Sequence, residues 1–262
     1  MRYALLAALA LAAAPFSGAQ EMVTVASRPD VTQSFLIAPM GGTQPQAIAL
    51  LFVGGTGHIN LRTENGVVKF GARNFLPRSR AEWSRNAILP VVMDAPSDHG
   101  DLPDNYRTGE EQAADARAVI AELKRRYPGL PVYLVGTSRG TVSAAYLGRA
   151  LGAEVAGVVL TSTMFRSRGR SQSVSLRGFD YSGISAPLLF VHHREDSCDV
   201  TPYSSAAELA ARYPLVSVKG GKPPESSPCE PLSAHGFFGR EPQTVDAIAS
   251  WMLKRAFAKE IE

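Results

Sequence analysis

The pentapeptide Gly136-Thr137-Ser138-Arg139-Gly140 sets a serine between two glycines, the G-x-S-x-G spacing of a tight turn that can expose a nucleophile. An apolar run, 132–136, precedes it, and an Ala-rich segment follows it. A serine on a turn between a buried strand and a helix is lifted out of the sheet edge, where the first helical amides favour developing negative charge. A five-residue pattern such as this also occurs by chance. In that case Ser138 is an ordinary serine in a tight turn. The chemistry therefore depends on partners elsewhere in the chain.

A serine becomes an effective nucleophile when a base takes its proton and a carboxylate holds that base in the right tautomer. His235 lies far downstream, beside a glycine in a loop just before the last expected helix, and fits the chain order Ser, acid, His. We predict His235 as the base; a capping or surface histidine is the alternative. The other histidines lie in two loops and at one strand end: His58, His99, His192 and His193.

The acid is expected just past the apolar run 187–193, where the sequence continues as Arg-Glu-Asp-Ser-Cys-Asp. Asp196 is the best placed of these carboxylates. Asp199 precedes Val-Thr-Pro, which resembles a helix start, so we predict that it caps the next helix. Glu195 remains the alternative acid.

A developing oxyanion needs two amide donors, and the turn that presents Ser138 supplies the first, from Arg139. The run AIALLFVGGTGH, 47–58, ends in a Gly-rich turn where the second belongs. We assign it to Thr56, with Gly55 or Gly57 allowing close approach of substrate. The alternative is that this Gly-rich sequence forms an ordinary tight turn with no role in binding an oxyanion.

The elements that must position these residues follow a strand-helix alternation. Five short, nearly continuous apolar runs, partly β-branched, indicate strands buried on both faces of a mainly parallel sheet: 47–55, 87–95, 132–136, 155–162 and 187–193. Residues 22–38 alternate enough for one or two leading antiparallel strands. The predicted fold class is therefore α/β.

Helices are predicted between and after these strands. Thr108 and Glu111 have capping-box spacing at the start of a helix that ends before Pro128-Gly129. Its apolar face would contain Ala113, Ala116, Ile120, Leu123 and Tyr127. A second helix follows Ser138, and a last one is expected over roughly 242–257.

On these residues the sequence resembles the α/β-hydrolase family over essentially all of its mature length. The resemblance implies Ser138 as nucleophile, Asp196 as acid and His235 as base, with Thr56 and Arg139 at the oxyanion hole. The segment VVMDAPSD, 91–98, also resembles the D-x-P-G segment of many members, with Ser97 at the usual glycine. Two departures from the family pattern leave the subfamily open. Gly54 stands where the common HG motif has histidine, and the acid loop lacks a leading glycine.

Two cysteines, Cys198 and Cys229, flank the expected acid and base. A disulfide between them would tie the loop of Asp196 to the loop of His235. Closing about 31 residues restricts the unfolded chain by roughly 3 kcal/mol. Two buried free thiols are the alternative.

The N-terminal segment has Arg2, an apolar stretch and small residues before Gln20, the three-part build of a secretory signal peptide over 1–19. An uncleaved N-terminal anchor is the alternative. We expect export to the periplasm or the exterior, where a disulfide persists, and one domain over 20–262. The net charge of +3 is too small to indicate nucleic-acid binding.

The expected activity is hydrolysis of a carboxylic ester or related acyl bond, without metal or cofactor. The histidine pair lacks the spaced partners of a zinc site. Thioesterase or peptidase activity, or a non-catalytic protein that binds an envelope component, are the alternatives. A short excursion after the run 155–162 is expected to form a minimal cap. The segment is basic, which favours an anionic substrate; a solvated loop is the alternative. Its basic residues are Arg166, Arg168, Arg170 and Arg177.

Overall fold

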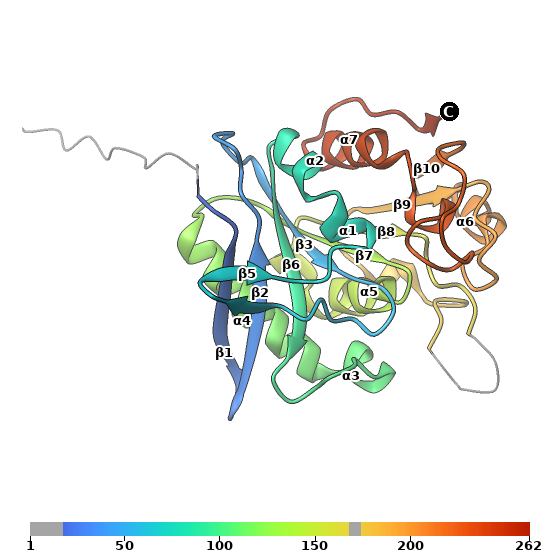
Figure 1. The fold of residues 1–262 in the computed structure, drawn as a ribbon. Coiled ribbons are helices and arrows are strands. Elements are labelled where there is room, and N and C mark those ends of the chain that lie inside the picture. Colours follow the sequence, from blue (N-terminus) through green and yellow to red (C-terminus); the bar gives the residue numbers. More distant parts are fainter. Residues whose placement is uncertain (1–17, 168–173) are drawn as a thin grey trace, which may run out of the picture.

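The computed structural model describes residues 18–167 and 174–262 (Figure 1). In these residues nine strands form one sheet in the order β1-β2-β6-β3-β7-β8-β9-β10-β11. Their bounds are β1 Glu21–Arg28, β2 Val31–Ile37, β3 Ala47–Phe52, β6 Ile88–Pro96, β7 Val132–Thr137, β8 Gly157–Thr161, β9 Leu188–His193, β10 Leu215–Val218 and β11 Glu260–Ile261. The expected signal peptide falls almost wholly outside the described residues.

The five apolar runs are confirmed as strands β3, β6, β7, β8 and β9, which pair with one another in parallel. The two leading strands are also confirmed: β1 pairs antiparallel with β2, and β2 pairs antiparallel with β6. Strands β10 and β11 continue the parallel part beyond β9. A separate hairpin joins β4 (Arg62–Glu64) and β5 (Val67–Lys69).

Helices cover both faces of the sheet (Figure 1). On one face, α4 (Glu110–Arg126) and α5 (Gly140–Leu151) bury one apolar cluster against the strands. On the other, α1 (Phe75–Arg78), α2 (Arg80–Arg85) and α7 (Glu241–Met252) bury a second. Alternate side chains of each strand enter opposite clusters, which is why the strands are apolar without interruption. The apolar face predicted for α4 is confirmed, with Ala113, Ala116, Ile120 and Leu123 buried and Tyr127 packed beside them.

The capping box predicted at Thr108 is wrong. Thr108 is the last residue of a preceding helix, α3 (Asp104–Thr108), and its hydroxyl donates to the carbonyl of Asp104 at 3.0 Å. Helix α4 begins after Gly109 with no side-chain cap. The hydroxyl is engaged one turn upstream and is therefore not available to α4. The last helix also ends earlier than expected, at Met252, and Lys254 takes a positive φ of 56°.

Helix α6 (Tyr203–Leu209) packs beside β9, and three short 3₁₀ helices cover Gly152–Glu154, Tyr181–Gly183 and Ala234–Gly236. Asp199 does not cap α6, contrary to the prediction. The residue before this helix is Pro202, and no side chain caps it. Among the described residues, no helix is both long and apolar enough to cross a bilayer.

Candidate functional site

The predicted residues gather at one edge of the sheet. Thr56, Ser138 and Asp196 follow β3, β7 and β9, three parallel strands whose carboxyl ends share that edge. His235 comes from the 3₁₀ helix Ala234–Gly236, within the long connection between β10 and α7. Open α/β sheets bind ligands at this edge, because the loops after neighbouring strands converge there.

Ser138 occupies a strained turn between β7 and α5. Its φ is +54°, a left-handed conformation that few non-glycine residues adopt. Hydrogen bonds hold this conformation: the Ser138 amide donates to the carbonyl of Thr161 at 3.1 Å, and the Ser138 carbonyl accepts from the amide of Thr141 at 2.9 Å. Strain of this kind persists only where the surrounding structure imposes it.

The two glycines of the pentapeptide are required by close backbone approach. A Cβ on Gly140 would lie 2.0 Å from the carbonyl oxygen of Phe52, and a Cβ on Gly136 would lie 2.3 Å from that of Gly140. Neither contact can be relieved by a side-chain movement, because the opposing atoms are backbone. Helix α5 can therefore start directly over the ends of β3 and β7.

The Gly-rich turn after β3 lies against Ser138, since a Cβ on Gly54 would approach that of Ser138 to 2.8 Å. Two guanidinium groups hold the carbonyl of Gly55: Arg107 donates at 3.1 Å and Arg139 at 3.4 Å. In a trans peptide the carbonyl and the following N–H point in opposite directions. The Thr56 amide is thereby turned away from the two arginines.

Arg107 is buried without a carboxylate partner in the described part of the chain. It donates to the carbonyls of Leu102 and Gly55 and to the hydroxyl of Ser143. Burial, and after it the charge of Arg139, lower the pKa of Arg107 to about 10. The group stays charged at neutral pH, so its bond to Gly55 is charge-assisted.

The side chain of Arg139 forms an ion pair with Asp104, at 2.6 Å between Nη2 and Oδ1. The second oxygen of Asp104 accepts from the amide of Val174 at 2.7 Å. The side chain of Arg139 therefore acts as a local ion-pair partner.

Asp196 and His235 form a buried pair. The Nδ1 atom of His235 lies 3.0 Å from Oδ2 of Asp196. Asp196 also accepts from the Cys198 amide at 3.0 Å and from the Thr201 hydroxyl at 2.8 Å. An ionised carboxylate only accepts hydrogen bonds, so Nδ1 of His235 carries the proton. The Nε2 atom then has a free lone pair, the state that a general base requires.

Two residues that sequence reasoning missed hold this pair in place. The Thr201 hydroxyl lies 2.8 Å from Asp196 and 3.2 Å from Nδ1 of His235. The Ser162 hydroxyl donates to the carbonyl of His235 at 2.8 Å. Both side chains are fully buried. No sequence signal marks them, because both contact His235, which lies 34 residues from Thr201 and 73 residues from Ser162.

Ser138, His235 and Thr56 line one pocket of about 320 Å³. The rest of the described lining is small, apolar or uncharged with one exception, the carboxylate of Glu230: Gly54, Gly55, Asn74, Phe75, Thr137, Cys229, Pro231 and Gly236.

Cys198 and Cys229 form a disulfide. Cys198 is buried beside Asp196, and Cys229 lines the pocket, so the bridge joins the loops of Asp196 and His235. Potential ligand atoms of both cysteines and Asp199 cluster within 4.8 Å. The bridged sulfurs are no longer thiolates, the form that binds metal, and this group is not a metal site.

The remaining histidines have other contacts. His58 lies 3.4 Å from Asp101 and His99 lies 2.9 Å from Asp98. His193 bonds to the carbonyl of Gly220 at 2.9 Å. None of these three lines the pocket of Ser138.

The basic side chains of the segment after β8 lie elsewhere. Arg166 and Arg177 line a different pocket, which shares no lining residue with that of Ser138. Arg168 and Arg170 fall outside the described residues.

Comparison with known proteins agrees with this architecture. Residues 105–220 match the family model described as serine aminopeptidase, S33, a hydrolase family. The chain has the α/β-hydrolase fold and is similar to members of that family. No curated protein sequence matches this chain.

Solved structures share the fold at low sequence identity. Est1E from Butyrivibrio proteoclasticus is 14% identical, with a TM-score of 0.60 over 89% of this chain and 98% of its own. An α/β serine hydrolase without a lid, from Xanthomonas campestris, is 15% identical, with a TM-score of 0.56 over 92% and 97%. The Pyrococcus furiosus esterase Pf2001 is 14% identical, with a TM-score of 0.57 over 91% and 93%.

His192 packs beside the acid loop as a neutral side chain. Its Nε2 accepts from the Thr163 amide at 2.8 Å, and its ring stacks on Phe165 at 5.5 Å. Burial lowers the pKa of His192 from 6.5 to about 3, and the nearby Asp196 carboxylate only partly opposes this shift. Between these pH values the unfolded chain binds a proton at His192 that the folded chain does not. Stability is therefore lost as the pH falls through this window.

Replacing His192 by Asn should reduce this acid sensitivity, because Asn retains an acceptor for the Thr163 amide and does not titrate. Because of this lowered pKa, the free energy of unfolding is about 2 kcal/mol smaller at pH 5 than at pH 7. Urea unfolding at both pH values measures the difference. His192→Asn should lose about 2 kcal/mol less than the wild type between pH 7 and pH 5. Equal losses would show that His192 does not resist protonation in the folded state.

Proposed function

We propose that the protein is a serine hydrolase that cleaves a carboxylic ester through an acyl-enzyme. The observation that carries the proposal is the buried hydrogen bond between Asp196 and His235, with His235 and Ser138 lining one pocket. Ser138 is the nucleophile, His235 the general base and Asp196 the acid that orients it.

In the first half of the reaction, Ser138 Oγ attacks the ester carbonyl carbon and its proton passes to Nε2 of His235. The resulting imidazolium is stabilised by Asp196, and it returns the proton to the leaving alcohol as the carbon–oxygen bond breaks. In the second half, water attacks the acyl carbon as Nε2 of His235 takes its proton. The bond between the acyl carbon and Ser138 Oγ then breaks, His235 returns the proton to Ser138 Oγ, and the acid is released.

The oxyanion is held by the backbone amides of Thr56 and Arg139. Support for Thr56 comes from the carbonyl of Gly55, which Arg107 and Arg139 hold on the side opposite to the Thr56 N–H. Support for Arg139 comes from its position directly after the nucleophile, before the first turn of α5. Each such donor typically contributes about 10²- to 10³-fold in turnover.

A neutral ester fits the pocket better than an anionic one. Glu230 is the one carboxylate of the described lining, and no lysine or arginine is among these residues. Esterase Pf2001 shares the fold, which is consistent with an ester but does not fix the substrate.

A peptidase is the second candidate, and the same Glu230 favours it. An exposed carboxylate in the pocket suits the ammonium group of a peptide N-terminus, and the matching family model is described as serine aminopeptidase. Turnover of 4-nitrophenyl butyrate, compared with that of alanine 4-nitroanilide, separates the two activities.

Export belongs to the same proposal. The segment 1–19 has the composition of a cleaved signal peptide. The disulfide between Cys198 and Cys229 is consistent with an oxidising compartment, where such bonds persist.

A fluorophosphonate probe should modify Ser138 and no other residue, because Ser138 is the serine that lines the same pocket as the proposed base, His235. Intact-mass and peptide mass spectrometry after labelling measure both the stoichiometry and the site. Ser138→Ala should abolish the adduct, and Ser250→Ala, a change on α7 away from the pocket, should leave it intact. An adduct that persists in Ser138→Ala would refute the assignment.

Asp196→Asn should lose far more turnover than Asp199→Asn, because only Asp196 bonds to His235. The acid-to-amide change in a triad of this kind costs about 10⁴-fold in turnover. Steady-state hydrolysis of 4-nitrophenyl butyrate measures the two losses, with circular dichroism to show that both variants fold. A larger loss at Asp199 would mean that Asp196 is not the acid.

A further inference from the structure

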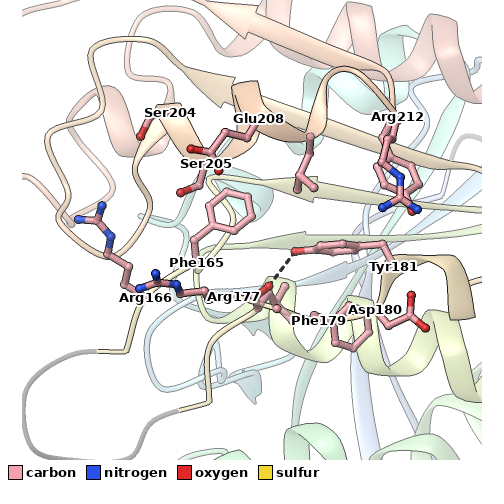
Figure 2. Close-up of a pocket in the computed structure, with 14 residues that line it drawn as sticks. Phe165, Arg166, Arg177, Phe179, Asp180, Tyr181, Ser204, Ser205, Glu208 and Arg212 are labelled. Carbon is pink, nitrogen blue, oxygen red and sulfur yellow. Dashed lines mark hydrogen bonds between the residues drawn. The ribbon is translucent and has the colours of Figure 1, made fainter.

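A second pocket, of about 360 Å³, lies outside the proposed active site (Figure 2). Its described lining comes from two parts of the chain. Residues 165–166 and 176–181 follow β8, and residues 204, 205, 208, 209, 212 and 213 belong to α6 and the turn that follows. A pocket of this size accommodates a small organic ligand. Its side chains indicate which one.

The floor of this pocket is apolar and aromatic. Phe165, Leu176 and Tyr181 are buried there, at 4%, 1% and 7% exposure. Phe179 and Tyr213 form half-buried walls, with ring centroids 5.1 and 6.0 Å from that of Tyr181. Ring edges and faces arranged in this way favour a further aromatic ring packed among them.

Three exposed arginines surround this floor: Arg166, Arg177 and Arg212. Figure 2 shows Arg166 and Arg177 at one end of the pocket and Arg212 at the other. In the described part of the chain, none of the three forms an ion pair with a carboxylate, whereas Arg28, Arg139 and many others do. Arginines that line a pocket and form no ion pair with a protein carboxylate can bind an anion there.

The net charge of the lining matches a monoanion. Among the described lining residues, Asp180 and Glu208 offset two of the three guanidinium groups, which leaves a formal charge of about +1. Asp180 is already engaged, since one of its oxygens accepts from the amide and hydroxyl of Ser182 at 3.0 and 2.6 Å. These bonds lower the pKa of Asp180, so it stays ionised and disfavours a dianionic phosphate.

We propose that this pocket binds a small aromatic carboxylate. The ring packs on the floor formed by Phe165, Leu176 and Tyr181, and the guanidinium groups of Arg166 and Arg177 hold the carboxylate. Hydroxyl groups of Ser204 and Ser205 on α6 line the same space and offer further donors. The proposal does not depend on the catalytic assignment, because it concerns binding at a separate set of residues.

The pocket is joined to the Asp196–His235 pair through the backbone. The carbonyl of Val200 accepts from the amides of Phe165 and Arg166 at 2.9 and 3.0 Å. The next residue, Thr201, contacts both members of the pair. A ligand held by Arg166 is therefore bound by a residue whose amide bonds to the residue just before Thr201. The carboxylate bound in this pocket has two possible sources. It is either a remote acid group on the ester substrate or a separate aromatic acid that modulates turnover.

Isothermal titration of the full chain with 3-phenylpropanoate tests the site without using activity. The neutral analogue 3-phenylpropanamide should bind at least about tenfold more weakly, because it lacks the charge-assisted bonds. The double variant R166Q/R177Q should lose at least about tenfold in affinity for the acid. The control R85Q removes an arginine charge on α2, away from this pocket, and should keep the affinity. No binding of the acid, equal affinity for the amide, or an equal loss in R85Q would overturn the proposal.

Kinetics then distinguish the two sources of the carboxylate. If the substrate supplies it, R166Q/R177Q should raise KM for the mono-4-nitrophenyl ester of 1,4-phenylenediacetic acid and leave KM for 4-nitrophenyl butyrate unchanged. If a separate acid supplies it, 3-phenylpropanoate should alter turnover of 4-nitrophenyl butyrate in the wild type and not in the double variant. Either result supports the site. If neither kinetic effect is seen and titration shows no binding, the binding proposal is wrong. If binding is retained but no hydrolysis is detected with any substrate, only the proposed function is refuted.

Discussion

The approach of helix α5 to the end of β3 is the constraint on which the site depends. Gly140 lies so close to the carbonyl of Phe52 that no side chain fits between them. This contact sets the position at which the chain must turn after β7, and the turn requires a positive φ at Ser138. The strain there is held by backbone hydrogen bonds to β8 and α5. A well-packed sheet supplies the free energy that keeps one residue in this conformation.

A second group of interactions holds Asp196 and His235, the proposed acid and base. Asp196 and His235 come from loops 39 residues apart, and a buried pair of this kind needs its remaining polar atoms satisfied. Thr201 and the Cys198 amide satisfy Asp196, and Ser162 anchors the backbone of His235. The disulfide adds a covalent link between the same loops. These contacts restrict the drift of the pair, and misplacement by about 1 Å in a catalytic group can cost about 100-fold in rate.

The turn after β3 depends on charge rather than on packing. Two guanidinium groups share the carbonyl of Gly55, and one of them, Arg107, is buried without a neutralising carboxylate among the described residues. Such a group is costly to bury and is retained where its hydrogen bonds fix a backbone orientation. The orientation that it fixes is that of the peptide between Gly55 and Thr56.

The strands, the main helices and the edge at which the site forms followed from the sequence, because buried parallel strands require continuous apolar runs whose ends converge. The pairing of Asp196 with His235 was also within reach, since chain order limits the histidines that can serve Ser138. The supporting residues were not. Thr201, Ser162 and Arg107 act through partners distant in sequence, and local patterns carry no sign of them. The failures at Thr108 and Asp199 have one cause: a polar residue near a helix start was expected to cap it, but Thr108 bonds within α3 and Pro202 begins α6 without a cap.

The central claim is that Ser138 presents its hydroxyl to a carbonyl whose oxygen meets the amides of Thr56 and Arg139. A crystal structure of the protein after reaction with a methyl alkylfluorophosphonate tests this most directly. The account predicts a phosphorus–oxygen bond at Ser138 Oγ, with the phosphonyl oxygen about 2.7 to 3.1 Å from both amide nitrogens. A phosphonyl oxygen directed away from Thr56 and Arg139, or an adduct on another residue, would contradict it.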